Sequence, residues 1–212
     1  MAGRLSRILL VAAALTTFAA CTARVEPPAD PVESVAVIVE TSEGAVTLEL
    51  WPDKAPKTVE NFLGYVDQKF YDGTIFHRVI PNFMIQGGGF TEDMKEKEAQ
   101  APIKNEARTD VPNRRGTIAM ARTNVVDSAK AQFFINHKDN AVLNHKNETP
   151  RGYGYAVFGK VTVGMDVVDK IAKTPTGNVG PFQDVPKTPV LITSIRRVKA
   201  TPDTQEEERH VQ

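Results

Sequence analysis

The sequence has little cysteine and histidine and no excess of either charge. One cysteine and four histidines occur among its 212 residues. A single cysteine cannot form an internal disulfide, and these few potential ligands lack the spacing of a zinc site. Lysine plus arginine and aspartate plus glutamate number 26 each, so no basic field favours a nucleic acid. We therefore expect no metal, no other cofactor and no nucleic-acid partner.

The apolar run near the N-terminus is too short to span a membrane. Residues 8–20 are uncharged and mostly apolar, and thirteen helical residues cover about 20 Å of a ~30 Å hydrocarbon core. Arg4 and Arg7 precede this run. A positive segment followed by a short apolar run is typical of a signal peptide, which we place at residues 1–20.

The apolar run ends in Phe18-Ala19-Ala20-Cys21, which resembles the lipobox of bacterial lipoproteins. There the cysteine is lipidated and becomes the new N-terminus, although leucine is more usual than phenylalanine at the first position. The alternative is a plain secretory signal cut near Ala23, with Cys21 incidental. Both alternatives predict an exported, periplasmic protein. In the first, membrane contact is made only through the lipid on Cys21, and in the second the protein is soluble.

The rest of the chain divides into a tether, one domain and a tail. Residues 21–34 are rich in proline and acidic residues and lack apolar periodicity, which is typical of an extended tether. Residues 200–212 hold few apolar side chains and are predicted to be disordered. The whole chain is 41% hydrophobic and 25% charged, as globular proteins are. We therefore expect one domain at residues 35–199.

The apolar pattern predicts that this domain is mostly β. Residues 35–41 are β-branched and apolar, and residues 45–50 alternate after a Ser-Glu-Gly turn, which predicts a hairpin. After Pro56 the apolar spacing becomes that of an amphipathic helix, and residues 165–172 predict a second one. The further expected strands lie near 74–80, 83–87, 116–121, 131–136, 155–161 and 189–198. Eight short strands and two α-helices favour a closed eight-stranded antiparallel β-barrel without exposed edges, although a sandwich fits the same pattern.

Three segments place polar side chains among aromatic ones, at residues 76–91, 116–122 and 128–136. Alternate residues of a strand share a face, so Gln132, Phe134 and Asn136 lie together. Phe133 and Ile135 then face the other way and can fill the barrel. The outer face would hold an aromatic ring, two amides and an arginine from the first segment. That mixture is typical of an apolar pocket with a few convergent polar groups.

The same segments resemble the signature of the cyclophilin family. The matching stretches are FHRVIPNFMIQGGGFT, GTIAMA, AQFFIN and YAVFGKVTVGMDVVDKI, in that order. The resemblance spans about residues 36–198 and is strongest to the compact bacterial type. It implies a cyclophilin-like barrel and a peptidyl-prolyl cis/trans isomerase that acts on proline-containing unfolded polypeptides. It also implies a monomer.

The resemblance implies a catalytic group and a binding group. Arg78 would stabilise the transition state of bond rotation, with Gln86 beside it and Phe83 in an apolar proline pocket. His77 sits at the edge of this group, and strand parity turns it to the face opposite Arg78, which favours a structural role over a catalytic one. The residues expected to bind substrate are Met84, Ala121, Arg122, Gln132, Phe134, Val142, Leu143 and Tyr155.

Three positions depart from the common pattern of the family. Val142 stands where many eukaryotic members carry tryptophan, Tyr155 where many carry histidine, and Arg122 where asparagine is common. The change at Val142 implies that cyclosporin binds only weakly.

Two other functions fit the resemblance besides an active isomerase: a binding module that uses the groove without turnover, and a scaffold tethered through Cys21. The presence of Arg78 favours the isomerase, because a pure binder does not need it.

Overall fold

The computed structural model describes residues 34–198 of the chain. The predicted signal peptide, Cys21, the tether up to residue 33 and the predicted tail lie outside the described residues. Within the described part, no helix is long and apolar enough to cross a membrane.

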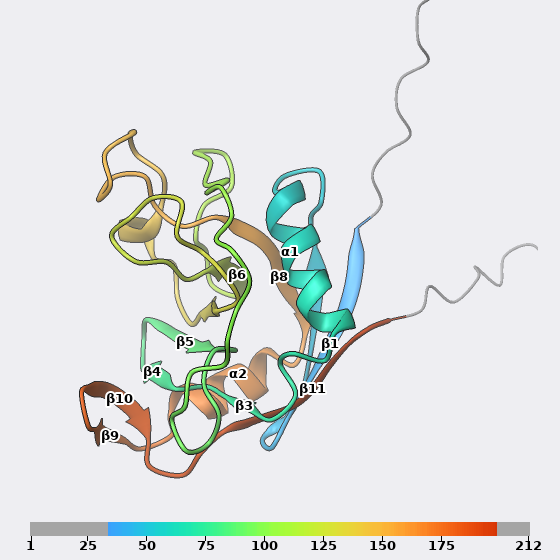
Figure 1. The fold of residues 1–212 in the computed structure, drawn as a ribbon, viewed down its shortest axis with the longest axis vertical. Coiled ribbons are helices and arrows are strands. Elements are labelled where there is room, and N and C mark those ends of the chain that lie inside the picture. The colour runs from blue at the N-terminus through green and yellow to red at the C-terminus, as the bar shows by residue number, and fades with distance from the viewer. Residues whose placement is uncertain (1–33, 199–212) are drawn as a thin grey trace, which may run out of the picture. The chain divides into compact units, whose positions relative to one another are not determined.

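One curled antiparallel sheet of nine strands forms most of the fold (Figure 1). In spatial order its strands are β3 (Thr74–Ile75), β11 (Leu191–Arg197), β1 (Val35–Thr41), β2 (Gly44–Leu50), β8 (Val157–Val163), β6 (Thr117–Met120), β7 (Phe133–Asn136), β5 (Met84–Gly87) and β4 (Arg78–Ile80). The N–H of Ile75 in β3 donates to the carbonyl oxygen of Phe90, just after β5, at 2.9 Å. This bond joins β3, at one end of the curled sheet, to the segment that follows β5 near the other end.

The predicted mostly β fold with two helices is confirmed, but the strands are counted differently. The expected strand at 74–80 is two strands, because the segment changes its partner midway. Phe76 donates its N–H to Val190, next to β11, whereas Arg78 pairs with Gln86 of β5. A separate hairpin of β9 (Thr176–Val179) and β10 (Phe182–Pro186) was not expected. Glycine and proline, which occur in and around it, are more typical of loops than of strands.

The two helices cover the open ends of the curled sheet with apolar side chains (Figure 1). Helix α1 (Pro56–Asp67) buries an apolar stripe of Val59, Phe62, Leu63 and Val66, at the spacing of the amphipathic helix predicted there. Helix α2 (Met165–Ala172) buries Val168 and Ile171. Fully burying side chains of this size contributes about 1.5–3 kcal/mol each.

Phe62 of α1 shows how the helix and the sheet share one core. Its ring centroid lies 5.6 Å from that of Phe133 in β7 and 5.2 Å from that of Phe158 in β8. Phe133 and Ile135 have no exposed surface, so they point into this core. Because side chains alternate along a strand, Phe134 must point to the outer face of the sheet.

Candidate active site

The outer face of four neighbouring strands carries a row of paired residues. Arg78 of β4 is the Cα partner of Gln86 in β5, and Gln86 is the partner of Phe134 in β7. Phe134 is in turn the partner of Ala119 in β6. Directly opposite residues on antiparallel strands project from the same face. The pairing register therefore places a guanidinium, an amide and an aromatic ring side by side.

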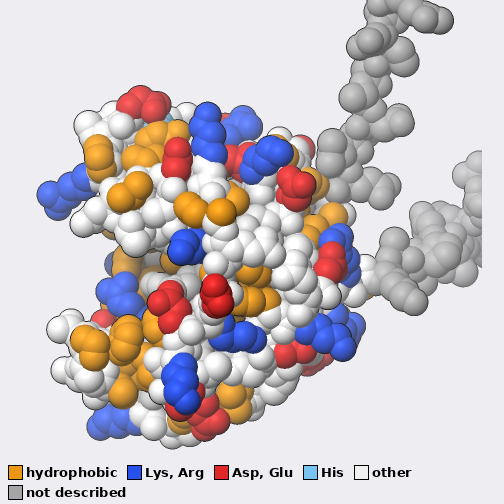
Figure 2. Space-filling model, in the orientation of Figure 1, with side chains coloured by type: hydrophobic (Ala, Val, Ile, Leu, Met, Phe, Trp, Pro, Cys, Tyr) orange, Lys and Arg blue, Asp and Glu red, His pale blue; other side chains and the backbone are white. Residues whose placement is uncertain are grey.

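This row borders a cavity of about 120 Å³. Figure 2 shows the molecule hollowed between the part that carries β4 and β5 and the loops on the other side. All of the lining residues belong to the predicted site, and they are Arg78, Phe83, Met84, Gln86, Ala121, Arg122, Phe134, Leu143 and Tyr155. The fold thus brings together residues from five separate parts of the chain, all of which the sequence motifs predict for the site.

Apolar side chains form part of the cavity wall, beside the polar groups of Arg78, Gln86 and Arg122. Met84 and Phe134 are buried, and Phe83, Leu143 and Tyr155 pack against them while partly exposed. The rings of Phe134 and Tyr155 meet edge to face, with their centroids 5.5 Å apart, an arrangement that aromatic pairs favour. A small apolar ring can pack against these side chains and exclude water from them.

Arg78 is the charged residue on the β4–β5 side of this lining, and one acidic side chain lies near it. Its Nε lies 3.7 Å from Oδ2 of Asp184 in β10, and both side chains are less than half exposed. The sequence motifs did not point to Asp184, because the hairpin that carries it was not expected. On the other side of Arg78, the Nε2 of Gln86 donates to Oε1 of Gln132 at 3.0 Å.

Comparison with known proteins agrees with this geometry. Residues 36–197 match the family described as cyclophilin type peptidyl-prolyl cis-trans isomerase/CLD. The chain belongs to the cyclophilin family. It is a peptidyl-prolyl cis-trans isomerase, and its substrates are peptides that contain proline.

Bacterial isomerases resemble this cyclophilin over most of their length. The peptidyl-prolyl cis-trans isomerase cyp18 of Streptomyces antibioticus is 60% identical over 160 residues, which cover 76% of this chain and 96% of that protein. Isomerase A of Dickeya dadantii is 55% identical over 166 residues, covering 78% and 86% of the two chains. Isomerase B of Escherichia coli is 54% identical over 159 residues, covering 75% and 97%.

Solved structures share the fold. A cyclophilin-type isomerase of Cryptosporidium parvum, crystallised in the presence of the dipeptide Ala-Pro, matches with a TM-score of 0.64 and 25% identity. The match covers 77% of this chain and 99% of that one.

His77 lies away from the cavity of this cyclophilin. Its side chain is buried, and its ring centroid is 4.6 Å from that of Phe90. Burial, and then the charge of Arg78, lower the pKa of His77 to about 4. The imidazole is therefore uncharged at neutral pH. His77 lies between β3 and β4 and is not among the residues that line the cavity, so this geometry gives its predicted catalytic role no support.

Two further predicted binding residues also lie outside the cavity lining. Gln132 lines an adjoining cavity of about 240 Å³, which shares Gln86, Ala121 and Arg122 with the first. Gln132 is still joined to the site through its hydrogen bond with Gln86. Val142, in the 3₁₀ turn Ala141–Leu143, is 72% exposed and lies next to the lining residue Leu143.

Arg122 was expected to line the groove, and its side chain also fastens the wall. Its guanidinium donates to the carbonyl oxygens of Gly154, Thr123 and Pro150 at 2.8–2.9 Å. Its Cζ also lies 4.9 Å from the centroid of the Tyr155 ring, within the range of a cation–π contact. Arg122 therefore holds the loop that ends at Tyr155 against the end of β6.

Proposed function

We propose that this cyclophilin accelerates rotation about X-Pro bonds by stabilising the twisted transition state with Arg78, while an apolar pocket holds the proline ring. Amide resonance opposes the rotation with a barrier of ~18–20 kcal/mol. Uncatalysed X-Pro bonds therefore exchange over tens to hundreds of seconds. Lowering this barrier requires an interaction that is stronger in the twisted state than in either planar isomer.

A guanidinium near the proline nitrogen provides such an interaction. When the bond twists, resonance is lost and the nitrogen becomes pyramidal, with a lone pair that can accept a hydrogen bond. That acceptor hardly exists in the planar ground state, so the N–H groups of Arg78 favour the transition state selectively. One donor of this kind contributes ~3–4 kcal/mol, or about 10²–10³ in rate.

The observation that carries the proposal is the row of strand partners Arg78, Gln86 and Phe134 beside the cavity. The row sets the guanidinium at the edge of an apolar wall. A proline ring against Phe134 would therefore present its nitrogen toward Arg78. The reaction so described needs no nucleophile and no proton transfer.

The conservative variant Arg78→Lys tests this mechanism. Lysine keeps the positive charge but replaces the planar fork of donors by a single ammonium. We expect Arg78→Lys to recover little of the rate, with kcat/KM about 10²-fold below the wild type in a proline-peptide assay. Activity close to that of the wild type would contradict the role of the guanidinium.

We further propose that the protein is exported, acts as a monomer on unfolded proteins of the periplasm, and is anchored to a membrane through a lipid on Cys21. The support is the sequence of residues 1–21, with its two arginines, short apolar run and lipobox-like end. Acyl chains contribute ~0.8 kcal/mol per buried CH₂, so several chains on one residue anchor a protein stably. The alternative is a soluble periplasmic isomerase. Mass spectrometry of the mature N-terminus distinguishes the two.

A further inference from the structure

A buried chain of three asparagine side chains lies next to the pocket. Asn136 ends β7, Asn140 precedes the 3₁₀ turn, and Asn113 lies in the loop before β6; each is at most 2% exposed. Asn136 Nδ2 donates to Asn113 Oδ1 at 3.1 Å, and Asn140 Nδ2 donates to Asn136 Oδ1 at 2.7 Å. The three amides are therefore connected, with Asn136 in the middle.

The two ends of this asparagine chain hold two residues that line the cavity. Asn140 Nδ2 also donates to the carbonyl oxygen of Phe83, in the turn between β4 and β5, at 2.7 Å. Asn113 Nδ2 donates to the carbonyl oxygen of Leu143, in the 3₁₀ turn, at 3.1 Å. Phe83 and Leu143 come from different elements and both border the cavity. The asparagine chain is thus a physical connection between two parts of the pocket wall.

Neighbouring hydrogen bonds fix the asparagine chain to the sheet and to the loops. Asn136 Nδ2 also donates to Oγ1 of Thr117 in β6 at 2.9 Å. The backbone N–H of Asn140 donates to the carbonyl oxygen of Asn113 at 2.8 Å. The N–H of Asn113 donates to Oδ1 of Asn144 at 2.7 Å. The three side chains therefore have little freedom to shift without breaking several bonds at once.

The amide group suits each link of this chain. A primary amide offers two N–H donors and a carbonyl acceptor, whereas a carboxylate only accepts and an aliphatic side chain does neither. In a buried, low-dielectric setting each such bond is strong, and a lost partner is costly. Reaction geometry is also sensitive to position, since a misplacement of 1 Å can cost roughly 10²-fold in rate.

We propose that the chain Asn113–Asn136–Asn140 sets the spacing of Phe83 and Leu143 and thereby positions the proline ring against Arg78. The three asparagines are positioning residues, because none of them lines the cavity. This inference rests on the proposed function of the pocket.

Variants of the two ends test the inference. Asn113→Ala removes the bond to Leu143, and Asn140→Ala removes the bond to Phe83. In the full-length protein, at a temperature where circular dichroism shows each variant folded, we expect each to lower kcat/KM by roughly 10- to 100-fold. Each should also weaken binding of the dipeptide Ala-Pro. The kcat/KM of the double variant should be little lower than that of the less active single variant, because both ends act through Asn136.

Thr74→Val is the matched control. Thr74 has no exposed surface, and its Oγ1 donates to the carbonyl oxygen of Tyr71 at 2.6 Å, away from the cavity lining. Its loss should lower stability and leave kcat/KM unchanged. The inference is overturned if folded Asn113→Ala and Asn140→Ala keep kcat/KM within about twofold of Thr74→Val. Additive losses in the double variant would overturn the connection through Asn136.

Two further measurements keep the outcomes distinct. Should one alanine variant fail to fold, Asn140→Ser and Asn113→Ser remove the same amide donors with a smaller loss of polarity, and the same two criteria apply. Arg78→Lys in the same assay judges the mechanism by itself. If that variant stays active, the proposed mechanism fails, while the comparison of the asparagine variants with Thr74→Val still decides the positioning role.

Discussion

His77 and Arg78 are adjacent in sequence, but Arg78 lines the cavity and His77 does not. Arg78 is partly exposed beside the cavity, whereas His77 is 5% exposed and packs against Phe90. Among the described residues the Nδ1 of His77 has no hydrogen-bond partner. A buried, uncharged imidazole that packs against Phe90 and lies outside the cavity lining serves packing and does not contact a substrate in the pocket.

His77→Gln should therefore retain most of the isomerase activity. Glutamine fills a comparable volume, and the change leaves the row of Arg78, Gln86 and Phe134 untouched. The measurement is kcat/KM at pH 7 for the variant and the wild type. A loss as deep as that of Arg78→Lys would instead assign His77 to the catalytic group.

The lowered pKa of His77 also predicts how stability depends on pH. The folded pKa is about 4 and an unfolded histidine titrates near ~6.5, so between these values the unfolded state binds the extra proton. Protonation of His77 therefore does not lower the free energy of unfolding above pH ~6.5. As the pH drops toward 4, the free energy of unfolding falls by up to roughly 3 kcal/mol. Urea unfolding at a series of pH values should show this loss in the wild type and not in His77→Gln. Parallel curves for the two proteins would contradict the burial argument.

Val142 offers a residue-scale prediction about inhibition. Its side chain is 72% exposed next to the pocket, and valine provides neither the broad face nor the N–H donor of the tryptophan common at this position. Val142→Trp should therefore tighten inhibition by cyclosporin without a large change in peptide turnover. Val163→Trp is the matched control, because Val163 is 65% exposed and does not line the cavity. Equal inhibition of the wild type and Val142→Trp would show that this position does not decide drug binding.

At the scale of elements, the β9–β10 hairpin carries Asp184, the acidic side chain that lies near Arg78. Its residue Asp184 has a φ of 59°, in the left-handed region, which aspartate and asparagine tolerate better than most residues. This conformation lies within the irregular part of the hairpin pairing, between Phe182 and Val185. Asp184 is thus both the residue with the left-handed conformation and the residue whose carboxylate lies 3.7 Å from the Nε of Arg78.

Asp184→Asn should lower kcat/KM by a few-fold at low salt, because it removes the negative charge that lies 3.7 Å from the Nε of Arg78. Partly exposed ion pairs contribute about 0–1 kcal/mol, so the effect is at most about fivefold. The loss should shrink at high salt, where the wild-type pair is screened. Glu40→Gln is the control, since it removes an ion pair with Arg196 between β1 and β11, of similar exposure. The same salt-dependent loss in both variants would contradict a specific role for Asp184.

The elements that sequence could predict are those with a clear apolar period. The stripe of α1 and the limits of α2 agree with the structure, as does the parity that turns Phe134 outward. The β9–β10 hairpin has no such period. Asp184 and Asn113 could not be found from their own segments, because their importance comes from contacts with residues far away in sequence. No local pattern records such contacts.

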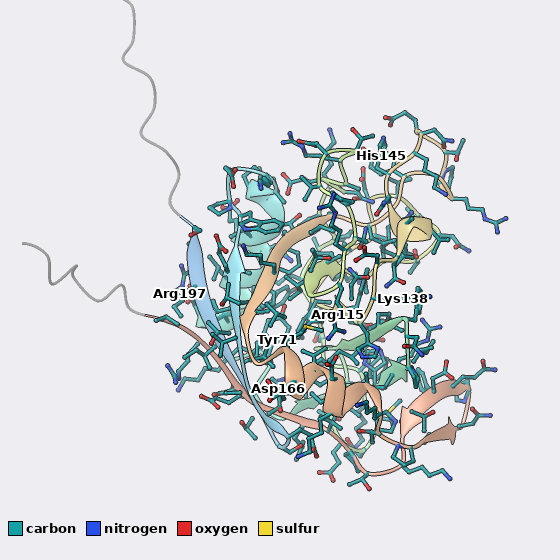
Figure 3. The ribbon with its side chains drawn as sticks, turned by 180° about the vertical axis from the view of Figure 1, so that it is seen from behind. Tyr71, Arg115, Lys138, His145, Asp166 and Arg197 are labelled. Carbon is teal, nitrogen blue, oxygen red and sulfur yellow. The ribbon has the colours of Figure 1, made fainter. Side chains whose placement is uncertain are left out.

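Across the whole molecule, contacts from distant parts of the chain converge on the wall of the pocket. Arg115, which Figure 3 shows close to α2, pairs with Asp169 of that helix at 2.8 Å and donates to the carbonyl oxygen of His137. His137 in turn donates its N–H to the carbonyl oxygen of Phe83 at 2.9 Å. The pocket is therefore supported from the sheet, from α2 and from the loops together.

The proposed anchor makes a prediction at this scale. If Cys21 is lipidated, the mature protein should sediment with membranes and enter detergent, and Cys21→Ser should abolish both. The thirteen residues from Thr22 to Ser34, if extended at ~3.1 Å each, would reach about 40 Å from the lipid. An unmodified chain that begins near Ala23 or Arg24 would leave a soluble isomerase and remove the tether from the account.

The most direct test of the account is Arg78→Ala, measured for both turnover and ground-state binding. Because Arg78 is proposed to act only on the twisted transition state, kcat/KM should fall by about 10²–10³. The affinity for Ala-Pro and the free energy of unfolding should remain close to those of the wild type. A folded Arg78→Ala protein with wild-type kcat/KM, or one whose loss of rate is matched by an equal loss of Ala-Pro affinity, would contradict it.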